Sequence, residues 1–211
     1  MTMRIIVDPG HGGRDPGAKG WQIPERTFPP TVEKDLSLQY ALDLEKELFY
    51  RGHQVDLTRR ADKYITLQER ARLTHTVRLP SADCFISIHF DACQYPNVRG
   101  TSALYNNWGN QSSKLGRPLA EALVTEVVRA AGTMNRGVFP RPSYKLTDEG
   151  EFVMAESQIY VLRHSKVWAA LIEIGFLSNY EEEKLVVSPL FRSLAVKGLA
   201  NGIEKWGKEY L

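Results

Sequence analysis

The sequence has little cysteine, almost no excess charge and no long apolar segment. Its two cysteines, Cys84 and Cys93, are too few for a disulfide framework and form no C-x-x-C pair, so we expect free thiols. The 27 basic and 25 acidic side chains leave a net charge of +2, which gives no electrostatic case for a nucleic-acid partner. No apolar run approaches the ~20 residues of a membrane span, so no membrane insertion is expected.

The N-terminal residues also lack a targeting pattern. The segment MTMRIIVDPGH passes almost directly into a predicted strand and has neither the basic nor the apolar region of a secretory signal. This pattern predicts synthesis in the cytoplasm without a signal peptide, unless a leader has been removed.

What the chain does have is the composition of one globular domain over residues 1–211, with 43% hydrophobic and 25% charged side chains. Apolar runs and periodicities predict alternating strands and helices. Strands are expected at 4–7, 53–58, 84–89, 101–106 and 169–175. Helices are expected at 33–51, from 66 to about 77, from about 113 to 131, and from 189 onward. This alternation favours an α/β fold, a twisted, mostly parallel (mixed) sheet flanked by helices on both faces.

Other parts of the chain carry weaker signals. The last helix is expected to have Ser188 as its N-cap, and its predicted apolar face consists of Leu190, Leu194, Leu199, Ile203 and Trp206. Residues 159–163 form a further apolar run. Residues 19–32 and 133–157 are expected to be irregular, and 143–157 to be an exposed hairpin or loop beside the active-site cleft.

A glycine-rich loop, VDPGHGGRDPGAKG, follows the first predicted strand. It fails the dinucleotide fingerprint, because Asp15 stands where the third glycine belongs. It also fails the phosphate-loop pattern, because Ala18 rather than lysine follows Gly17. Two alternatives remain: a plain turn, or a loop that holds His11 for chemistry.

Histidines and carboxylates follow or end several of these predicted elements. His11 follows the first strand, His89 ends the strand at 84–89, and Glu33 starts the first helix. Glu173 lies within the apolar strand ALIEIGF, where an unpaired charge would be costly to bury. In an open α/β sheet such ends meet at one edge. Two histidines and one carboxylate are a suitable zinc set with an open position, and the other glutamate would then act as general base.

Taken singly, most of these residues also have a structural interpretation. His11 could simply bond within a turn, His89 could be a satisfied core histidine, and Glu33 could be a carboxylate favoured at a helix N-terminus. Only for Glu173 does the sequence context, taken by itself, favour a functional role. The remaining histidines, His53, His75 and His164, are expected at the surface because their neighbours are polar.

The segments VDPGHGGRDPGA, EKDLSLQYA, LQERARL, ADCFISIHFDA and ALIEIGFLSN follow one another in a recognisable order. With them, the chain resembles the zinc-dependent N-acetylmuramoyl-L-alanine amidases, the type 3 peptidoglycan amidases, from about residue 3 to residue 207. The resemblance implies one Zn²⁺ per chain, bound by His11, Glu33 and His89, with Glu173 as the catalytic glutamate. It also implies hydrolysis of the amide between the lactyl group of N-acetylmuramic acid and L-alanine of the peptidoglycan stem.

Some positions depart from the family or remain open. Asp91 stands where the family commonly has asparagine, which places an extra carboxylate near the zinc. Arg70 and Asn179 are further candidates for contact with the ligands or the substrate. Glu25 competes with Glu33 as the third ligand, although no helix start follows it.

Two rival functions stay open at this stage. A zinc peptidase of carboxypeptidase-like geometry would need an arginine for a terminal carboxylate, and the unassigned arginines are Arg59, Arg60, Arg70 and Arg163. A non-catalytic peptidoglycan-binding module would not need Glu173. We expect a monomer that acts on the cell wall, with no separate wall-binding domain. A phage endolysin released through a holin, a mother-cell lytic enzyme and a truncated autolysin domain would all fit.

Overall fold

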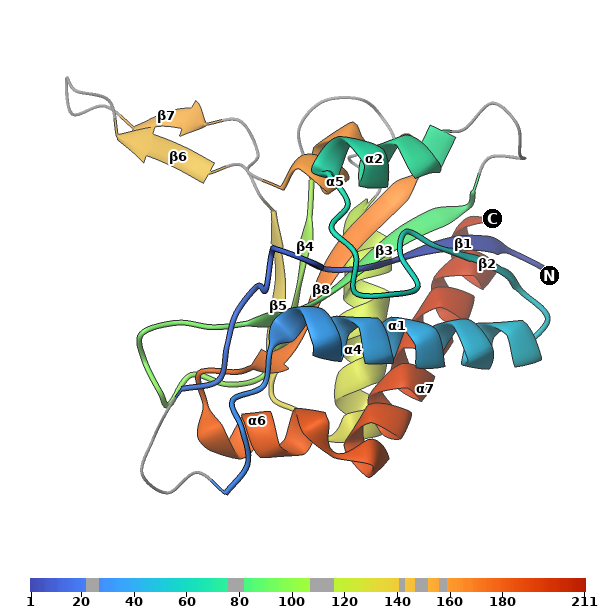
Figure 1. Cartoon of the computed structure of the whole chain (residues 1–211). Coiled ribbons are helices and arrows are strands. Elements are labelled where there is room, and N and C mark those ends of the chain that lie inside the picture. Colours follow the sequence, from blue (N-terminus) through green and yellow to red (C-terminus); the bar gives the residue numbers. More distant parts are fainter. Residues whose placement is uncertain (22–26, 76–81, 107–115, 141–142, 147–151, 156–158) are drawn as a thin grey trace.

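The structure is a computed structural model that describes residues 1–21, 27–75, 82–106, 116–140, 143–146, 152–155 and 159–211 (Figure 1). Its centre is a six-stranded sheet of order β2-β1-β3-β8-β4-β5. The strands are β1 (Arg4–Pro9), β2 (Gln54–Leu57), β3 (Cys84–Asp91), β4 (Thr101–Tyr105), β5 (Asn135–Pro140) and β8 (Trp168–Phe176). The first four strands in that order run parallel, and β4 pairs antiparallel with β8. The predicted mixed, mostly parallel sheet is therefore confirmed.

Helices cover both faces of this sheet, as predicted. The helices are α1 (Glu33–Tyr50), α2 (Leu67–Arg72), α4 (Gly116–Ala131), α5 (Tyr160–His164), α6 (Tyr180–Val187) and α7 (Pro189–Tyr210). In Figure 1, α1, α4 and α7 lie on one side of the sheet, while α2 and α5 lie on the other. The central strands are buried by both layers, which explains why their sequences are continuous apolar runs rather than alternating ones.

Strand periodicity assigns side chains to two cores. Ile86, Ile88 and Ile172 face the larger core, which is shared with α1, α4 and α7. Phe85 and Leu171 face the smaller core beneath α2 and α5. Because side chains alternate along a strand, His89 and Glu173 belong to the same face as the smaller core. The parallel register of β3 and β8 pairs His89 directly with Glu173.

The segment 133–157, expected to be irregular, contains regular structure. Residues Asn135–Pro140 form β5, which pairs with β4 at the edge of the sheet. The sequence of this strand, NRGVFP, is polar and contains glycine, so it lacks the apolar pattern from which a strand is predicted. An edge strand can have such a sequence because it needs little apolar surface. The hairpin alternative for 143–157 is confirmed by β6 (Ser143–Leu146) and β7 (Phe152–Ala155), which pair antiparallel and project beyond the sheet in Figure 1.

The ends and faces of two helices need correction. The capping box at Thr66 is present, but α2 ends at Arg72 and continues only as a short 3₁₀ helix, Leu73–His75. Residues 76–81, where the predicted helix end falls, lie outside the described residues. In α7, Ser188 is the N-cap without a side-chain hydrogen bond. Leu190, expected on the buried face, is 72% exposed, and Phe191 is buried in its place.

Within the described residues, no helix is both long enough and apolar enough to cross a bilayer.

The apolar run at 159–163 forms most of the short helix α5, whose Val161 and Leu162 pack into the smaller core.

Candidate active site and metal centre

The glycine-rich loop leaves β1 at Pro9 and turns sharply at His11, whose φ of 59° lies in the left-handed region. This conformation is uncommon for a residue other than glycine. At Gly10, an added Cβ would lie 2.3 Å from the His89 imidazole. At Gly17, it would lie 2.5 Å from a Glu33 oxygen. The glycines therefore leave room for the side chains of the site, which favours the second of the two interpretations of this loop.

Two buried arginines hold the backbone of this loop. The Arg59 guanidinium donates to the carbonyl of Gly10 at 2.7 Å, and that of Arg70 donates to Pro9 at 2.7 Å and to His11. Both arginines are 3% exposed. The carbonyls of three consecutive residues accept hydrogen bonds from these charged donors, and these bonds stabilise the unusual backbone conformation of His11.

The charge of Arg70 is compensated by Asp8 on β1. The Asp8 carboxylate accepts hydrogen bonds from Arg70 at 2.6 Å, from Thr58 at 2.5 Å and from Ser87 at 2.7 Å. Asp8 is 1% exposed, so this ion pair is buried and well supplied with hydrogen bonds. Separating the two side chains would leave an uncompensated buried charge. The pair therefore stays together and supports the backbone of the glycine-rich loop.

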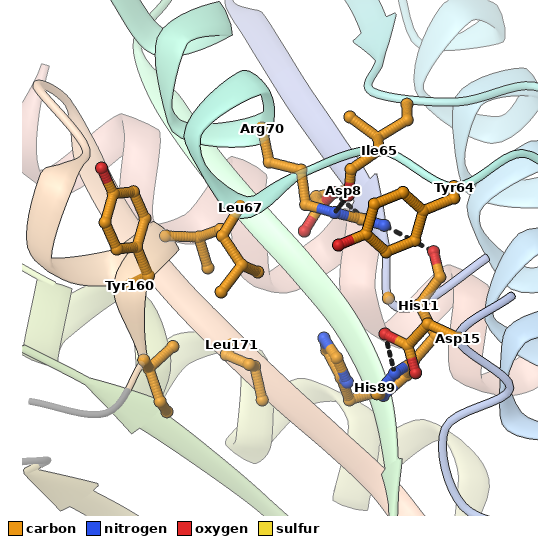
Figure 2. Close-up of a pocket in the computed structure, with 13 residues that line it drawn as sticks. Asp8, His11, Asp15, Tyr64, Ile65, Leu67, Arg70, His89, Tyr160 and Leu171 are labelled. Atoms are coloured by element: carbon orange, nitrogen blue, oxygen red, sulfur yellow. Dashed lines mark hydrogen bonds and ion pairs between the residues drawn. The ribbon is translucent and has the colours of Figure 1, made fainter. Parts of the chain in front are cut away.

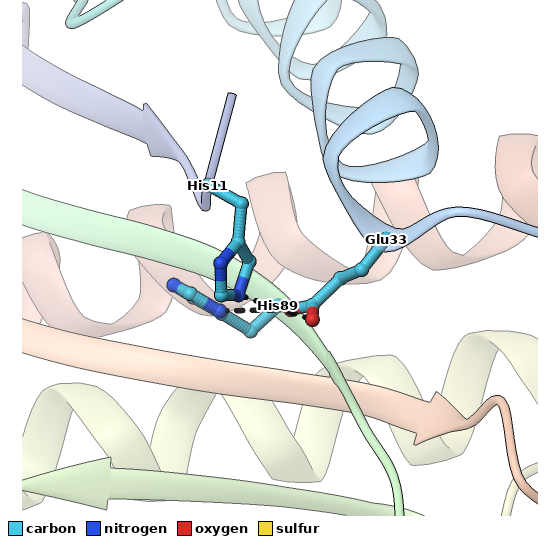
Figure 3. Close-up of side chains that lie close together, drawn as sticks. All are labelled: His11, Glu33 and His89. Atoms are coloured by element: carbon cyan, nitrogen blue, oxygen red, sulfur yellow. Dashed lines mark hydrogen bonds and ion pairs between the residues drawn. The ribbon is translucent and has the colours of Figure 1, made fainter. Parts of the chain in front are cut away.

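Above this base, His11, Glu33 and His89 come together from three elements. Figure 3 shows them converging from the loop after β1, the start of α1 and the end of β3. One Glu33 oxygen lies 3.0 Å from His11 Nε2, and the other lies 2.9 Å from His89 Nδ1. One ligand atom from each residue lies within 4.8 Å of the others.

Glu33 is held in place by the backbone around it. Its carboxylate accepts the N–H of Ala18 at 2.7 Å and that of Phe90 at 3.1 Å, and the residue is 3% exposed. Burial acts to raise the pKa of Glu33, but its hydrogen bonds to His11 and His89 outweigh burial and lower that pKa well below its ordinary value. Glu33 therefore remains an anion that is ready to bind a cation.

A residue that the sequence analysis missed, Asp15, orients His11. Its carboxylate lies 3.0 Å from His11 Nδ1, on the opposite side of the ring from Glu33. Burial acts to lower the pKa of His11, but Glu33 and Asp15 together raise it. A carboxylate on the far nitrogen of a histidine ligand is the usual support of such a ligand. The spacing His-x₃-Asp in the glycine-rich loop was the sequence signal from which this role of Asp15 could have been predicted.

These three side chains fit a metal ion. Two imidazoles and one carboxylate form the donor set of many catalytic zinc sites, in which zinc–ligand distances are about 2.0–2.2 Å and one position stays open. Asp15 supplies the outer hydrogen bond, and Gly10 and Gly17 keep the space free of Cβ atoms. The structure thus contains a candidate metal site.

Glu173 lies beside this cluster rather than within it. It is half-buried on β8, one strand away from His89, and its Oε2 atom is shielded from solvent. Glu173 stands opposite His89 in the register of β8 and β3, and its carboxylate is not one of the ligand groups whose atoms lie within 4.8 Å of one another. Glu173 also lines a cavity of about 370 Å³ on the side of β4 and β5.

A second cavity, of about 320 Å³, lies beneath α2 and α5. Figure 2 shows Tyr64 and Tyr160 on its two sides, with Leu67 and Leu171 between them. His11 and His89 form its end nearest the candidate metal site. The candidate site therefore adjoins two cavities, one lined mainly by apolar and aromatic side chains with a few charged ones, the other by Glu173 and further charged residues.

Comparison with known proteins identifies the family of this chain. Residues 5–205 match the sequence model of a family described as N-acetylmuramoyl-L-alanine amidase. The chain belongs to the N-acetylmuramoyl-L-alanine amidase family. The match covers nearly the stretch over which the sequence analysis found the resemblance, and it confirms that resemblance.

Two solved structures agree with this chain in fold over nearly its full length. A crystal structure of an N-acetylmuramoyl-L-alanine amidase from Clostridium difficile 630 has a TM-score of 0.80 and 27% identity, covering 100% of this chain and 99% of that one. The catalytic domain of the amidase CwlV from Bacillus (Paenibacillus) polymyxa var. colistinus has a TM-score of 0.78 and 26% identity, covering 98% and 99%.

The two curated relatives are longer than this chain. The probable cell wall amidase LytH of Staphylococcus epidermidis is 29% identical over 96% of this chain, and LytH of Staphylococcus aureus is 29% identical over 95%. The chain spans 57% of the length of each of these two relatives.

Two further candidate residues, Asn179 and Asp91, lie at the ends of elements. Asn179 is the N-cap of α6, where its Oδ1 accepts the N–H of Glu182 at 2.9 Å while its Nδ2 donates to Pro96 at 2.8 Å. Asp91 ends β3 and lines the cavity that Glu173 lines. A role for either in substrate binding stays a prediction. Glu25, the competing ligand, lies outside the described residues.

The prediction of a surface position for His53 is wrong. His53 is 5% exposed, because its ring lies between the start of β1 and helix α7. There it accepts the N–H of Met3 at 3.2 Å and lies 3.2 Å from a Glu204 oxygen. Its polar sequence neighbours hid this burial. His164 is half-buried and stacks on Tyr160, and nothing further is described for the side chain of His75.

Both cysteines are free, as expected. Cys84 is fully buried at the start of β3, where burial raises the pKa of its thiol. Cys93 is half-buried, and its thiol donates to the carbonyl of Tyr95 at 3.4 Å. Neither sulfur belongs to the candidate metal cluster.

Proposed function

We propose that this chain hydrolyses the amide bond between the lactyl group of N-acetylmuramic acid and L-alanine in peptidoglycan, with one zinc ion held by His11, Glu33 and His89. The observation that carries the proposal is the pairing of Glu173 with His89 across β3 and β8, beside the cluster of three ligand side chains. The membership of the chain in the amidase family supports the choice of bond.

Each group has a distinct chemical task. Zinc bound by these side chains would polarise the scissile carbonyl and lower the pKa of water far below its ordinary value, toward ~7. Glu173 takes the proton of the attacking water and passes it to the leaving amine of L-alanine, a contribution typically worth ~10²–10⁴-fold. Its position outside the three-residue cluster suits a base better than a ligand.

The surrounding residues act by positioning. Asp15 holds the Nδ1 side of His11, so that Nε2 points toward Glu33. Arg59 and Arg70 fix the carbonyls on which the orientation of His11 depends. These contacts reduce the reorganisation that metal and substrate binding would otherwise require.

The structure also bears on the two rival functions. Of the four arginines that a carboxypeptidase could use, Arg59 and Arg70 hold the glycine loop, and Arg60 forms an ion pair with Glu45 on the surface. A wall-binding module would bind peptidoglycan without releasing new L-alanine amino termini. The two rivals therefore differ from the proposal in the product that forms.

The test of the proposal is the variant Glu173→Gln, with His89→Ala as its counterpart. Glu173→Gln keeps the shape but cannot accept a proton, so we expect it to bind zinc stoichiometrically and still bind purified peptidoglycan. Its release of L-alanine amino termini should fall by ~10²-fold or more. His89→Ala should instead lose most of its zinc.

Metal analysis and labelling of released amino termini separate the outcomes. If zinc were lost together with the Glu173 carboxylate, Glu173 would be a ligand. If the wild-type chain bound walls but released no L-alanine amino termini, the wall-binding module would be the right description. Release from ordinary peptides at an equal rate would favour a peptidase.

The place of action proposed here is the cell wall, where the substrate occurs, with the chain acting as a monomer. The holin-dependent release considered from the sequence stays a prediction.

A further inference from the structure

The cavity of about 370 Å³ beyond Glu173 has charges of opposite sign at its two ends. Glu173 and Asp91 line it at the end nearest the candidate metal site, and Arg136 of β5 lines it further out. Between them lie Ser102 and Leu104 of β4. Because β4 and β5 follow β8 in the sheet, this cavity continues from the catalytic position toward the edge of the sheet.

The position of Glu173 fixes the direction in which a substrate lies. Glu173 passes its proton to the leaving amine, so the nitrogen of L-alanine must point toward β8. The stem peptide then continues over β4 and β5, into the cavity that ends at Arg136. The lactyl group and its sugar are left on the opposite side, in the aromatic cavity between Tyr64 and Tyr160 (Figure 2).

Arg136 is available for a ligand. It lies at the register shift between β4 and β5, is exposed, and has its guanidinium 5.1 Å from the centre of the Phe176 ring. None of the ion pairs of the described residues involves Arg136, and its charge acts only at longer range on the buried carboxylate of Glu182. An arginine supported on an aromatic face, with its fork of donors free, is well suited to a carboxylate.

The spacing matches a dipeptide unit. β5 is two strands from β8, which is about 10 Å between backbones, and the side chains of Glu173 and Arg136 shorten this span. Two extended residues span about 7 Å. The second stem residue, linked through its γ-carboxyl, carries either a free α-carboxylate (D-glutamate) or a neutral amide (D-isoglutamine). The leaving amine and this α-group would face Glu173 and Arg136 respectively.

We propose that Arg136 binds the α-carboxylate of the second stem residue and makes the chain prefer stems with D-glutamate over stems with D-isoglutamine. This inference rests on the proposed function, because the direction of the substrate follows from the role of Glu173. It assigns the β4–β5 cavity to the peptide and a specificity-determining role to Arg136.

The experiment compares two muropeptides that differ only in this α-carboxylate or α-amide. Wild-type protein loaded with zinc should favour the carboxylate by about 5- to 10-fold in kcat/KM, mainly through KM, since Arg136 is exposed and remote from the reacting bond. Arg136→Gln should lose this preference by weakening the carboxylate substrate alone, and Arg136→Lys should retain part of it. Arg99→Gln is the matched control, since Arg99 is exposed nearby and outside the described cavity lining.

A binding measurement separates this inference from the proposed function. Calorimetry with L-alanyl-D-glutamate and L-alanyl-D-isoglutamine should show the same preference in wild type and its loss in Arg136→Gln. Equal binding and turnover of the two forms by wild type, or an equal effect of Arg136→Gln on both, would overturn the inference while leaving amidase activity intact. If the protein bound L-alanyl-D-glutamate more tightly than L-alanyl-D-isoglutamine but hydrolysed neither muropeptide, the role of Arg136 in specificity would be supported and the proposed function rejected.

Discussion

His11 has a left-handed backbone, and its ring lies between two carboxylates. Its φ is 59°, and its two ring nitrogens are each 3.0 Å from an oxygen of Asp15 or Glu33. A ring with a carboxylate at each nitrogen favours the protonated form, which is why the pKa of His11 is raised despite burial. Protons therefore compete with zinc for the His11 ring up to a higher pH than they would for an ordinary imidazole.

At this scale we predict the behaviour of Asp15→Asn. The variant loses the anion that orients His11, so its zinc affinity at pH 8 should fall about 10- to 100-fold. It also loses one cause of the raised His11 pKa, so proton competition should set in at a lower pH than in wild type. Zinc affinity measured by chelator competition between pH 5.5 and 8.5 tests both effects. A fall in affinity with an unchanged pH profile would show that Asp15 does not act through His11.

Among the elements, α4 and α7 are in unusually close contact. A Cβ added at Gly198 of α7 would lie 2.7 Å from the Val127 Cα, and one at Gly202 would lie 2.9 Å from the Leu123 Cα. Both neighbours are backbone atoms of α4, which cannot move without shifting the helix. Two glycines four residues apart on one face of α7 thus bring the two helices together behind the sheet.

The element-scale prediction concerns Gly198→Ala. Alanine is the better helix former by about 1 kcal/mol, but overpacking of a tight contact costs about 1–3 kcal/mol, and here the contact is backbone. We expect a net loss of up to about 2 kcal/mol in the free energy of unfolding, measured with urea, with zinc affinity unchanged. Exposed Lys197→Ala serves as the control. If Gly198→Ala were more stable than wild type, the contact between α4 and α7 would have space for the added methyl group.

For the whole molecule, the candidate metal site joins segments that are distant in the sequence. Its residues come from the loop after β1, from α1 and from β3, so an ion held there would tie the sheet to a helix on its larger-core side. A ligand that binds only the folded state stabilises it by about 2.7 kcal/mol at 100 times its dissociation constant. Zinc at that concentration should raise the free energy of unfolding by this amount relative to chelator.

The sign of the pH dependence follows from His11. Its pKa is raised above 6.5 in the metal-free fold, so protonated His11 contributes stability below pH 6.5 that is lost as pH rises through the raised value. Zinc must displace this proton. At a fixed zinc concentration, the stabilisation by zinc should therefore be smaller at pH 6 than at pH 8, as urea unfolding with zinc or chelator would reveal. Equal stabilisation at both values would contradict the assignment of His11 as a ligand.

Much of the fold followed from local patterns. Helix α1 buries Leu36, Tyr40, Leu44 and Leu48 as its spacing predicted, because one apolar stripe every three to four residues has few ways to be buried. The strands β1, β3 and β8 are apolar runs between turn residues. The edge strand β5 and the buried position of His53 escaped prediction, because their environment is created by distant segments.

The sequence by itself determined the chemistry available: two histidines and two glutamates at element ends, a glycine loop that is neither kind of nucleotide loop, and resemblance to a family of amidases. Only the tertiary structure decided which of these groups meet. The pairing of β8 with β3 placed Glu173 beside His89, and the contacts of Asp15, Arg59 and Arg70 appeared only when the loop was in place. The physical reason is that periodicity reports how much each residue is buried, whereas strand order and register decide against what it is buried.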